Sequence, residues 1–149
     1  DLRPHIAKML MDAGVVDSID EAFDAYLGRG KKAFVKKEVF EAEEAIKMIH
    51  DAGGVAVLAH PASLELNETD FPPYLDRLID FGIDGIEVYV PTHSVEQMLF
   101  FRGLASDREL LISAGSDFHG DIKPDISIGR CYQGNYVYDS MISGELLEL

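Results

Sequence analysis

The sequence is poor in cysteine and in long apolar runs. Cys131 is its one cysteine, which excludes an internal disulfide and is typical of a reducing compartment. No apolar stretch approaches the roughly 20 residues that cross a bilayer. The sequence from Asp1 onward also lacks the basic leader and apolar run of a signal peptide. These absences predict a cytoplasmic protein without a membrane span.

Basic side chains are scarce as well. The 149 residues hold 13 Lys and Arg against 27 Asp and Glu, a net charge of −14. A broad electrostatic grip on a nucleic-acid backbone is therefore not expected, although a metal cluster or a few local bases can still reverse the field for a small anion. What is plentiful is apolar: a hydrophobic content of 47% is enough for one domain with a core. The chain does not begin with Met, which suggests a piece of a longer protein.

The first part of the sequence predicts two short helices. Pro4 and Gly14 are typical of the first turn and the end of one helix. Ser18 is the expected N-cap of the second, which runs to about residue 27. We expect this helical hairpin, residues 1–32, to form a module distinct from residues 33–149.

Beyond the hairpin, strands and helices are expected to alternate. Short apolar runs predict strands at 33–35, 55–59, 86–90, 110–114 and 135–138. Amphipathic stretches predict helices at 42–51, 72–81 and 95–106. Continuous apolar strands joined through helices are typical of a parallel sheet covered on both faces. The prediction is an α/β fold.

Metal-ligating side chains follow three of these strands directly. His60 and His93 each come after one strand, and Asp117 and His119 come after a third. The carboxyl ends of parallel strands share one face, and residues i and i+2 of an extended chain point to the same side. Imidazole and carboxylate groups bind Zn²⁺, Mn²⁺ or Fe²⁺. The pattern predicts a metal site at this face, against the competing interpretation that polar residues favour strand ends in any fold.

Other titratable residues have weaker claims. His50 lies on a helix away from any strand end and is expected to be solvated or capping, and Cys131 is expected to be an incidental loop thiol. Glu87 lies within a strand, where a buried carboxylate is costly unless it is bonded; it is expected to face the site or hold a neighbour of it. Arg3 and His5 lie at a helix start, where backbone N–H groups favour anions.

Three segments resemble the PHP (polymerase and histidinol phosphatase) superfamily. They are Gly53–Pro61, Gly85–Ser94 and Gly115–Gly120, and Arg-Pro-His-Ile-Ala at residues 3–7 matches as well. The most similar branch consists of small metal-dependent phosphoesterases that act on nucleoside 3′,5′-bisphosphates and short RNA 5′ ends. The resemblance implies the C-terminal part of a distorted (β/α)7 barrel with two or three divalent ions (Mn, Fe or Zn). The hairpin would belong to an inserted lid module.

The resemblance also implies roles for individual residues. The implied metal ligands are His60, Asp117 and His119. The implied contacts to substrate phosphates are Arg3, His5, Lys37 and His93, with His93 and Asp117 also catalytic. The family's N-terminal half, with its His-x-His pair and bridging Glu, has no counterpart in this chain.

The expected activity of the intact protein is phosphoester hydrolysis by a metal-activated hydroxide. Two alternatives stay open: a fragment that binds metal or a partner without catalysis, and an amidohydrolase-type C–N hydrolase. The bases at Arg3 and Lys37 argue mildly against the latter. The expected partners are a small phosphorylated substrate, the missing half of the barrel and, through open strand edges, another copy of the chain.

Overall fold

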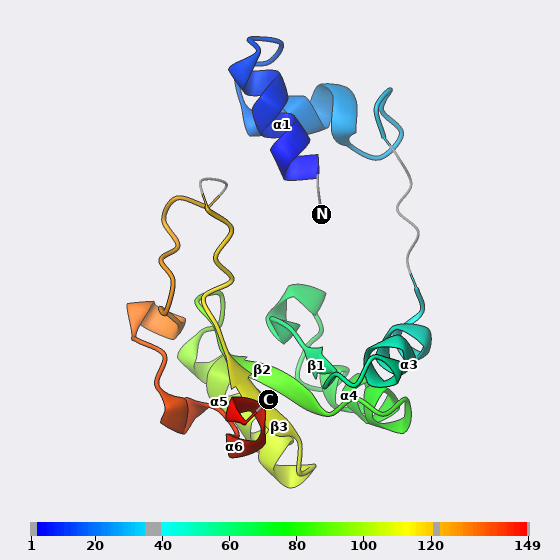
Figure 1. Ribbon diagram of the computed structural model, residues 1–149, viewed down its shortest axis with the longest axis vertical. Coiled ribbons are helices and arrows are strands. Elements are labelled where there is room, and N and C mark those ends of the chain that lie inside the picture. The colour runs from blue at the N-terminus through cyan, green and yellow to red at the C-terminus, as the bar shows by residue number, and fades with distance from the viewer. Residues whose placement is uncertain (1–2, 35–39, 121–122, 149) are drawn as a thin grey trace. The chain divides into compact units, whose positions relative to one another are not determined.

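The computed structural model describes residues 3–34, 40–120 and 123–148 (Figure 1). The chain forms two compact units, Asp1–Val39 with His119–Pro124 and Phe40–Phe118 with Asp125–Leu149. Among the described residues, no helix combines the length and the apolar character needed to cross a membrane.

The first unit contains a small helical hairpin. It contains α1 (Arg3–Asp12), α2 (Ile19–Ala22) and a π-helical turn, η1 (Phe23–Leu27), that continues α2. Gly14, with φ of +68°, follows the end of α1, and the hydroxyl of Ser18 accepts a backbone N–H in the first turn of α2. Both predicted helices are confirmed. Their shared core is Ala7, Val16, Ala22 and Leu27.

The second unit contains a parallel sheet of three strands. β1 (Val57–Leu58), β2 (Gly85–Tyr89) and β3 (Leu111–Ala114) lie in the order β1-β2-β3, and both pairings are parallel. The helices between and before them are α3 (Ala42–Asp51), α4 (Phe71–Asp80) and α5 (Val95–Asp107). The mixed fold with a parallel sheet is therefore confirmed, with β1 shorter than the predicted strand at 55–59.

The helices bury one face of the central strand. Phe71 of α4 and Phe101 of α5 belong to the same buried cluster as Ile86 and Val88 of β2. Side chains alternate along a strand, so Glu87 projects from the opposite face. That face is where a half-buried carboxylate can meet residues from both neighbouring strands.

The two edges of the sheet differ. At β3, Ser143 covers the outer edge, because its N–H donates to the Ile112 carbonyl at 2.9 Å and its Oγ accepts the Ile112 N–H at 2.8 Å. At β1, the described part of the chain provides β2 as the one strand neighbour. A further strand could thus be added at β1.

Two predicted strands did not form as expected. The segment 135–138 is not a strand: it makes one isolated antiparallel bridge, Arg130↔Tyr136. There the Arg130 guanidinium lies 3.6 Å from the centre of the Tyr136 ring, so the alternating aromatic residues serve a tight loop and not a sheet. Residues 33 and 34 are not in a strand, and Val35 lies outside the described residues.

Beyond β3, the chain contains three further short helices, η4 (Tyr132–Gly134), η5 (Asp139–Met141) and α6 (Gly144–Leu147).

Asp84, the residue before β2, connects α3 to the residue before β1 through hydrogen bonds. Its Oδ2 accepts the Ala56 N–H at 2.6 Å and the Nε2–H of His50 at 2.8 Å. His50 is exposed, as expected, but sequence reasoning missed this partner. Partial burial opposes ionisation of Asp84, yet the hydrogen bonds from His50 and Ala56 outweigh it, and the pKa of Asp84 lies below its ordinary value.

Asp84→Asn should therefore lower the free energy of unfolding at pH 7 by about 1 kcal/mol, the scale of a partly solvated charged hydrogen bond. Since the folded-state pKa is depressed, this contribution is present above the ordinary pKa of 3.8 and is lost as the pH falls through the lower folded value. Urea denaturation at pH 7 and at acid pH measures both. Asp80→Asn, at an exposed position of α4, is the matched control. Equal unfolding free energies for Asp84→Asn and wild type at pH 7 would contradict the prediction.

Candidate functional site

Three of the predicted site residues follow the carboxyl ends of neighbouring strands. His60 lies two residues beyond β1, His93 follows β2, and Asp117 follows β3. Because β1, β2 and β3 are parallel and adjacent, their carboxyl ends lie side by side. We call this end of the sheet, as distinct from its lateral edge strands, the carboxyl edge. Electrostatic influence of His60 on His93, and of both His60 and Asp117 on Glu87, agrees with this convergence.

His60 has an unusual backbone. Its φ and ψ are 30° and 60°, in the left-handed region, which non-glycine residues rarely adopt. Its N–H donates to Oε2 of Glu87 at 2.7 Å, and its Nδ1 lies 2.9 Å from Oγ of Ser63. Pro61 then begins the short helix η2 (Pro61–Leu64). The neighbours of His60 thus fix both its main chain and its imidazole ring.

Asp117 shares this feature. Its φ is 51°, and its side chain is half-buried at the end of β3. Left-handed non-glycine residues are costly and collect at functional sites. Two of the predicted metal ligands, on different loops of one sheet edge, therefore carry backbone strain.

Glu87 lies between these two loops. The half-buried carboxylate has a raised pKa, chiefly because burial disfavours its charge and also because Asp117 is nearby, while the N–H and imidazole of His60 oppose the shift. The sequence expectation that Glu87 holds a neighbour is confirmed at the backbone of His60. Sequence reasoning missed its second neighbour, Gly115, where an added Cβ would lie 2.8 Å from Oε1 of Glu87.

His93 is buried, with 3% of its surface exposed. Nδ1 donates to the Val88 carbonyl at 2.8 Å, and the ring lies against Phe101 with centroids 4.9 Å apart. Nε2 is buried and finds no hydrogen-bond partner among the described residues. Burial lowers the pKa of His93 and outweighs the bond to the Val88 carbonyl, which raises it, while the nearby imidazole of His60 lowers it further. A neutral ring that donates through Nδ1 presents an Nε2 lone pair, which can accept a proton or bind a metal ion.

The donors present suit a divalent metal in type but not in number. Among the residues that the structure describes, no group of three or more His, Cys, Asp and Glu side chains is arranged to hold a metal ion. His60 and Asp117 belong to the second unit and His119 to the first, so the three-ligand set stays a prediction. A complete metal site needs donors beyond those that this sheet edge brings together.

The predicted phosphate contacts lie mostly outside this sheet. Arg3 and His5 are in the first turn of α1, in the first unit, and Lys37 lies outside the described residues. Their role toward a substrate stays a prediction.

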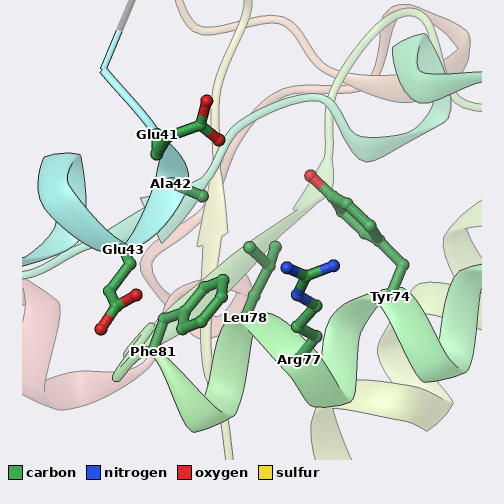
Figure 2. Close-up of a pocket in the computed structure, with 7 residues that line it drawn as sticks. All are labelled: Glu41, Ala42, Glu43, Tyr74, Arg77, Leu78 and Phe81. Carbon is green, nitrogen blue, oxygen red and sulfur yellow. The ribbon is translucent and has the colours of Figure 1, made fainter.

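Two pockets in the second unit differ in character. One, of about 360 Å³, lies between the start of α3 and α4, with Arg77 between Tyr74 and Phe81 (Figure 2). None of the predicted site residues lines it, so we do not regard it as the active site.

The second pocket, of about 350 Å³, borders Pro91 just after β2 and reaches Cys131. Burial raises the pKa of the Cys131 thiol against a backbone bond from Tyr132, which argues against a nucleophilic thiolate.

Comparison with known proteins gives a consistent group of relatives, although no family model matches the chain. A 5′-3′ exoribonuclease of Haemophilus influenzae is 40% identical over 121 residues, 78% of this chain and 43% of that protein. A 3′,5′-nucleoside bisphosphate phosphatase of Chromobacterium violaceum is 39% identical over 78% of this chain and 41% of its own length. A solved structure from Bifidobacterium adolescentis, provisionally described as a metal-dependent phosphoesterase, superposes with a TM-score of 0.70 at 32% identity, over 93% of this chain and 47% of that one.

The chain thus spans a little under half the length of the relatives it matches. Within that span the likeness extends over most of the chain, in sequence and in fold alike. The relatives found by sequence that are named for a reaction act on phosphoesters. A solved structure from Chromobacterium violaceum, described as an amidohydrolase, also superposes with a TM-score of 0.65 at 32% identity, over 88% of this chain and 45% of that one. The names of the sequence relatives favour phosphoester hydrolysis over the C–N hydrolase alternative. Over a little under half of their length, the chain is similar to proteins named as 5′-3′ exoribonucleases and as a 3′,5′-nucleoside bisphosphate phosphatase, and to a structure described as a metal-dependent phosphoesterase, which is consistent with a PHP-type phosphoesterase.

Proposed function

We propose that the natural protein containing this chain is a metal-dependent phosphoesterase. Its substrates would be nucleoside 3′,5′-bisphosphates or short RNA 5′ ends, the chemistry in the names of its relatives. The observation that carries the proposal is the convergence of His60, His93 and Asp117 at the carboxyl end of one parallel sheet. The sequence identity to enzymes of this class supports it.

The proposal includes the finer architecture. The sheet would be the C-terminal part of a distorted (β/α)7 barrel, the open side of β1 would receive the remaining strands, and the helices of residues 1–32 would belong to a lid module. His60, Asp117 and His119 would hold divalent metal ions together with donors from the rest of the barrel. When bound, such ions supply a hydroxide at neutral pH and positive charge for the phosphoryl oxygens.

The chain's own residues would do three further things. Nε2 of His93, buried and neutral, can take up a proton at the site or accept a hydrogen bond from a substrate hydroxyl. Arg3, His5 and Lys37 would hold the phosphate that does not react, through donor groups suited to phosphate oxygens. The core against His93 excludes water from one side of the site, which strengthens each polar contact there.

Phosphate release by the natural protein tests the proposal. With Mn²⁺, it should release phosphate from adenosine 3′,5′-bisphosphate, and chelation should reduce the rate at least tenfold, reversibly on adding Mn²⁺, because the hydroxide depends on the ion. Inorganic phosphate is measured over time, beside a cyclic amide substrate as the control. Hydrolysis of the amide without phosphate release would favour the C–N hydrolase, and no metal-dependent hydrolysis of either would favour a non-catalytic domain.

A further inference from the structure

Glu87 lies on the central strand, β2, of the sheet at whose carboxyl edge the predicted site residues converge. β2 has β1 on one side and β3 on the other, and Glu87 pairs in register with Ser113 of β3. Its side chain leaves the sheet on the face opposite Ile86 and Val88, away from the helices. It is therefore within reach of both neighbouring strand ends.

Toward β1, the contact of Glu87 is a directed hydrogen bond. Oε2 accepts the N–H of His60 at 2.7 Å, at the residue whose φ is 30°. A left-handed residue must be held by its surroundings to keep that conformation. The Glu87 carboxylate supplies such a hold from 27 residues away in the sequence.

Toward β3, the contact of Glu87 is steric. A Cβ at Gly115 would lie 2.8 Å from Oε1 of Glu87, closer than real Cβ atoms come to an oxygen. Gly115 does not have a positive φ, so its backbone conformation does not call for glycine, and the missing Cβ leaves room for the Glu87 carboxylate where it lies. Its N–H donates to the Tyr89 carbonyl at 2.9 Å, which fixes the chain two residues before Asp117.

We propose that Glu87 is a positioning residue that sets the separation of the His60 and Asp117 loops, by its bond to the His60 N–H and its packing on Gly115. We call these two contacts the Glu87 bridge. The proposal rests on the proposed function, since it assigns the bridge an effect on the metal that these loops would bind. A half-buried carboxylate close to Asp117 is an expensive way to fill space, which favours a positioning role over packing.

Mn²⁺ affinity of the natural protein, measured by calorimetry beside the unfolding temperature, tests the bridge. Glu87→Ala should weaken Mn²⁺ binding by about 10–100-fold, the usual effect of removing a group that orients a ligand, in a protein that still folds. Glu87→Gln keeps an oxygen that can accept the His60 N–H and should stay within about threefold of wild type. Gly115→Ala alone should weaken binding by about tenfold, because the new Cβ displaces the carboxylate.

The double variant is the sharpest measurement. If Gly115→Ala acts through Glu87, it should add no further loss in the Glu87→Ala background. Gly103→Ala is the matched control, because a Cβ there meets no atom within 4 Å. Additive losses, wild-type affinity in Glu87→Ala, or failure of Glu87→Ala to fold would each overturn the proposal. Absence of Mn²⁺ binding by the wild type would instead identify the proposed function as the error, and the bridge with it.

Discussion

In the proposed phosphoesterase, replacing His93 with phenylalanine is expected to leave a folded protein whose phosphoester hydrolysis falls by about 10²–10⁴-fold, the range for loss of a proton-transfer group. Phenylalanine fills the same site against Phe101, whose ring centroid is 4.9 Å from that of His93. It loses the bond to the Val88 carbonyl, at about 1 kcal/mol. It also removes Nε2, a buried nitrogen without a described partner, which is costly to bury. The lost hydrogen bond and the removal of the buried nitrogen nearly offset each other in the free energy of unfolding. Nothing offsets the loss of the proton-transfer group, so the rate falls while the protein stays folded.

The pH dependence of stability provides an independent check on the same residue. Burial depresses the pKa of His93 below its ordinary 6.5 in the folded state. Below pH 6.5 the unfolded chain therefore binds a proton that the folded protein resists, and stability falls until the pH reaches the lower folded value. Urea denaturation at pH 7.5 and pH 5 should show this loss for wild type and a smaller loss for His93→Phe.

Two outcomes would contradict this account of His93. A variant with wild-type phosphate release would mean that Nε2 takes no part in the reaction. A variant that does not fold would mean that the imidazole is a structural requirement of the loop after β2. His93→Gln, which can still bond the Val88 carbonyl through its amide, separates loss of that bond from loss of the ring nitrogen.

The features that sequence could predict are those set by neighbouring residues. Short apolar runs predicted the three strands, and amphipathic stretches predicted the helices, of which α5 begins with Ser94 in a full capping box. Strand order then brought His60, His93 and Asp117 to one edge. The failure at 135–138 has the same origin, because the local pattern of apolar residues is present, but within the described part of the chain this segment pairs only through the isolated bridge Arg130↔Tyr136.

What sequence could not predict depends on contacts between distant residues. Glu87 meets His60 across 27 positions, and His50 meets Asp84 across 34. The left-handed backbone of His60 and the space that Gly115 leaves for Glu87 follow from the same packing. The sequence shows Glu87 only as a carboxylate within an apolar strand. It does not show which residues of the neighbouring strands the carboxylate meets, so no definite role could be predicted for Glu87.

The core that supports this edge is built around Phe71. Its ring is 1% exposed and makes edge-on contacts with Phe101 at 5.0 Å and Phe100 at 6.2 Å between centroids. Phe101 in turn touches His93. The aromatic cluster of α4 and α5 thus reaches from the helix layer to His93.

Phe71→Ala should lower the free energy of unfolding by about 3–5 kcal/mol, because removing a fully buried aromatic ring loses its transfer free energy and leaves a cavity. That is a large part of the roughly 5–15 kcal/mol that holds a domain together. Urea denaturation at pH 7 measures the loss, with Leu99→Ala on α5 as the control, since Leu99 is 56% exposed and should cost less than about 0.5 kcal/mol. Because the His93 ring rests on this cluster, the variant should also lose the depressed His93 pKa as water enters. Equal losses for Phe71→Ala and Leu99→Ala would mean that the cluster is not the core of this unit.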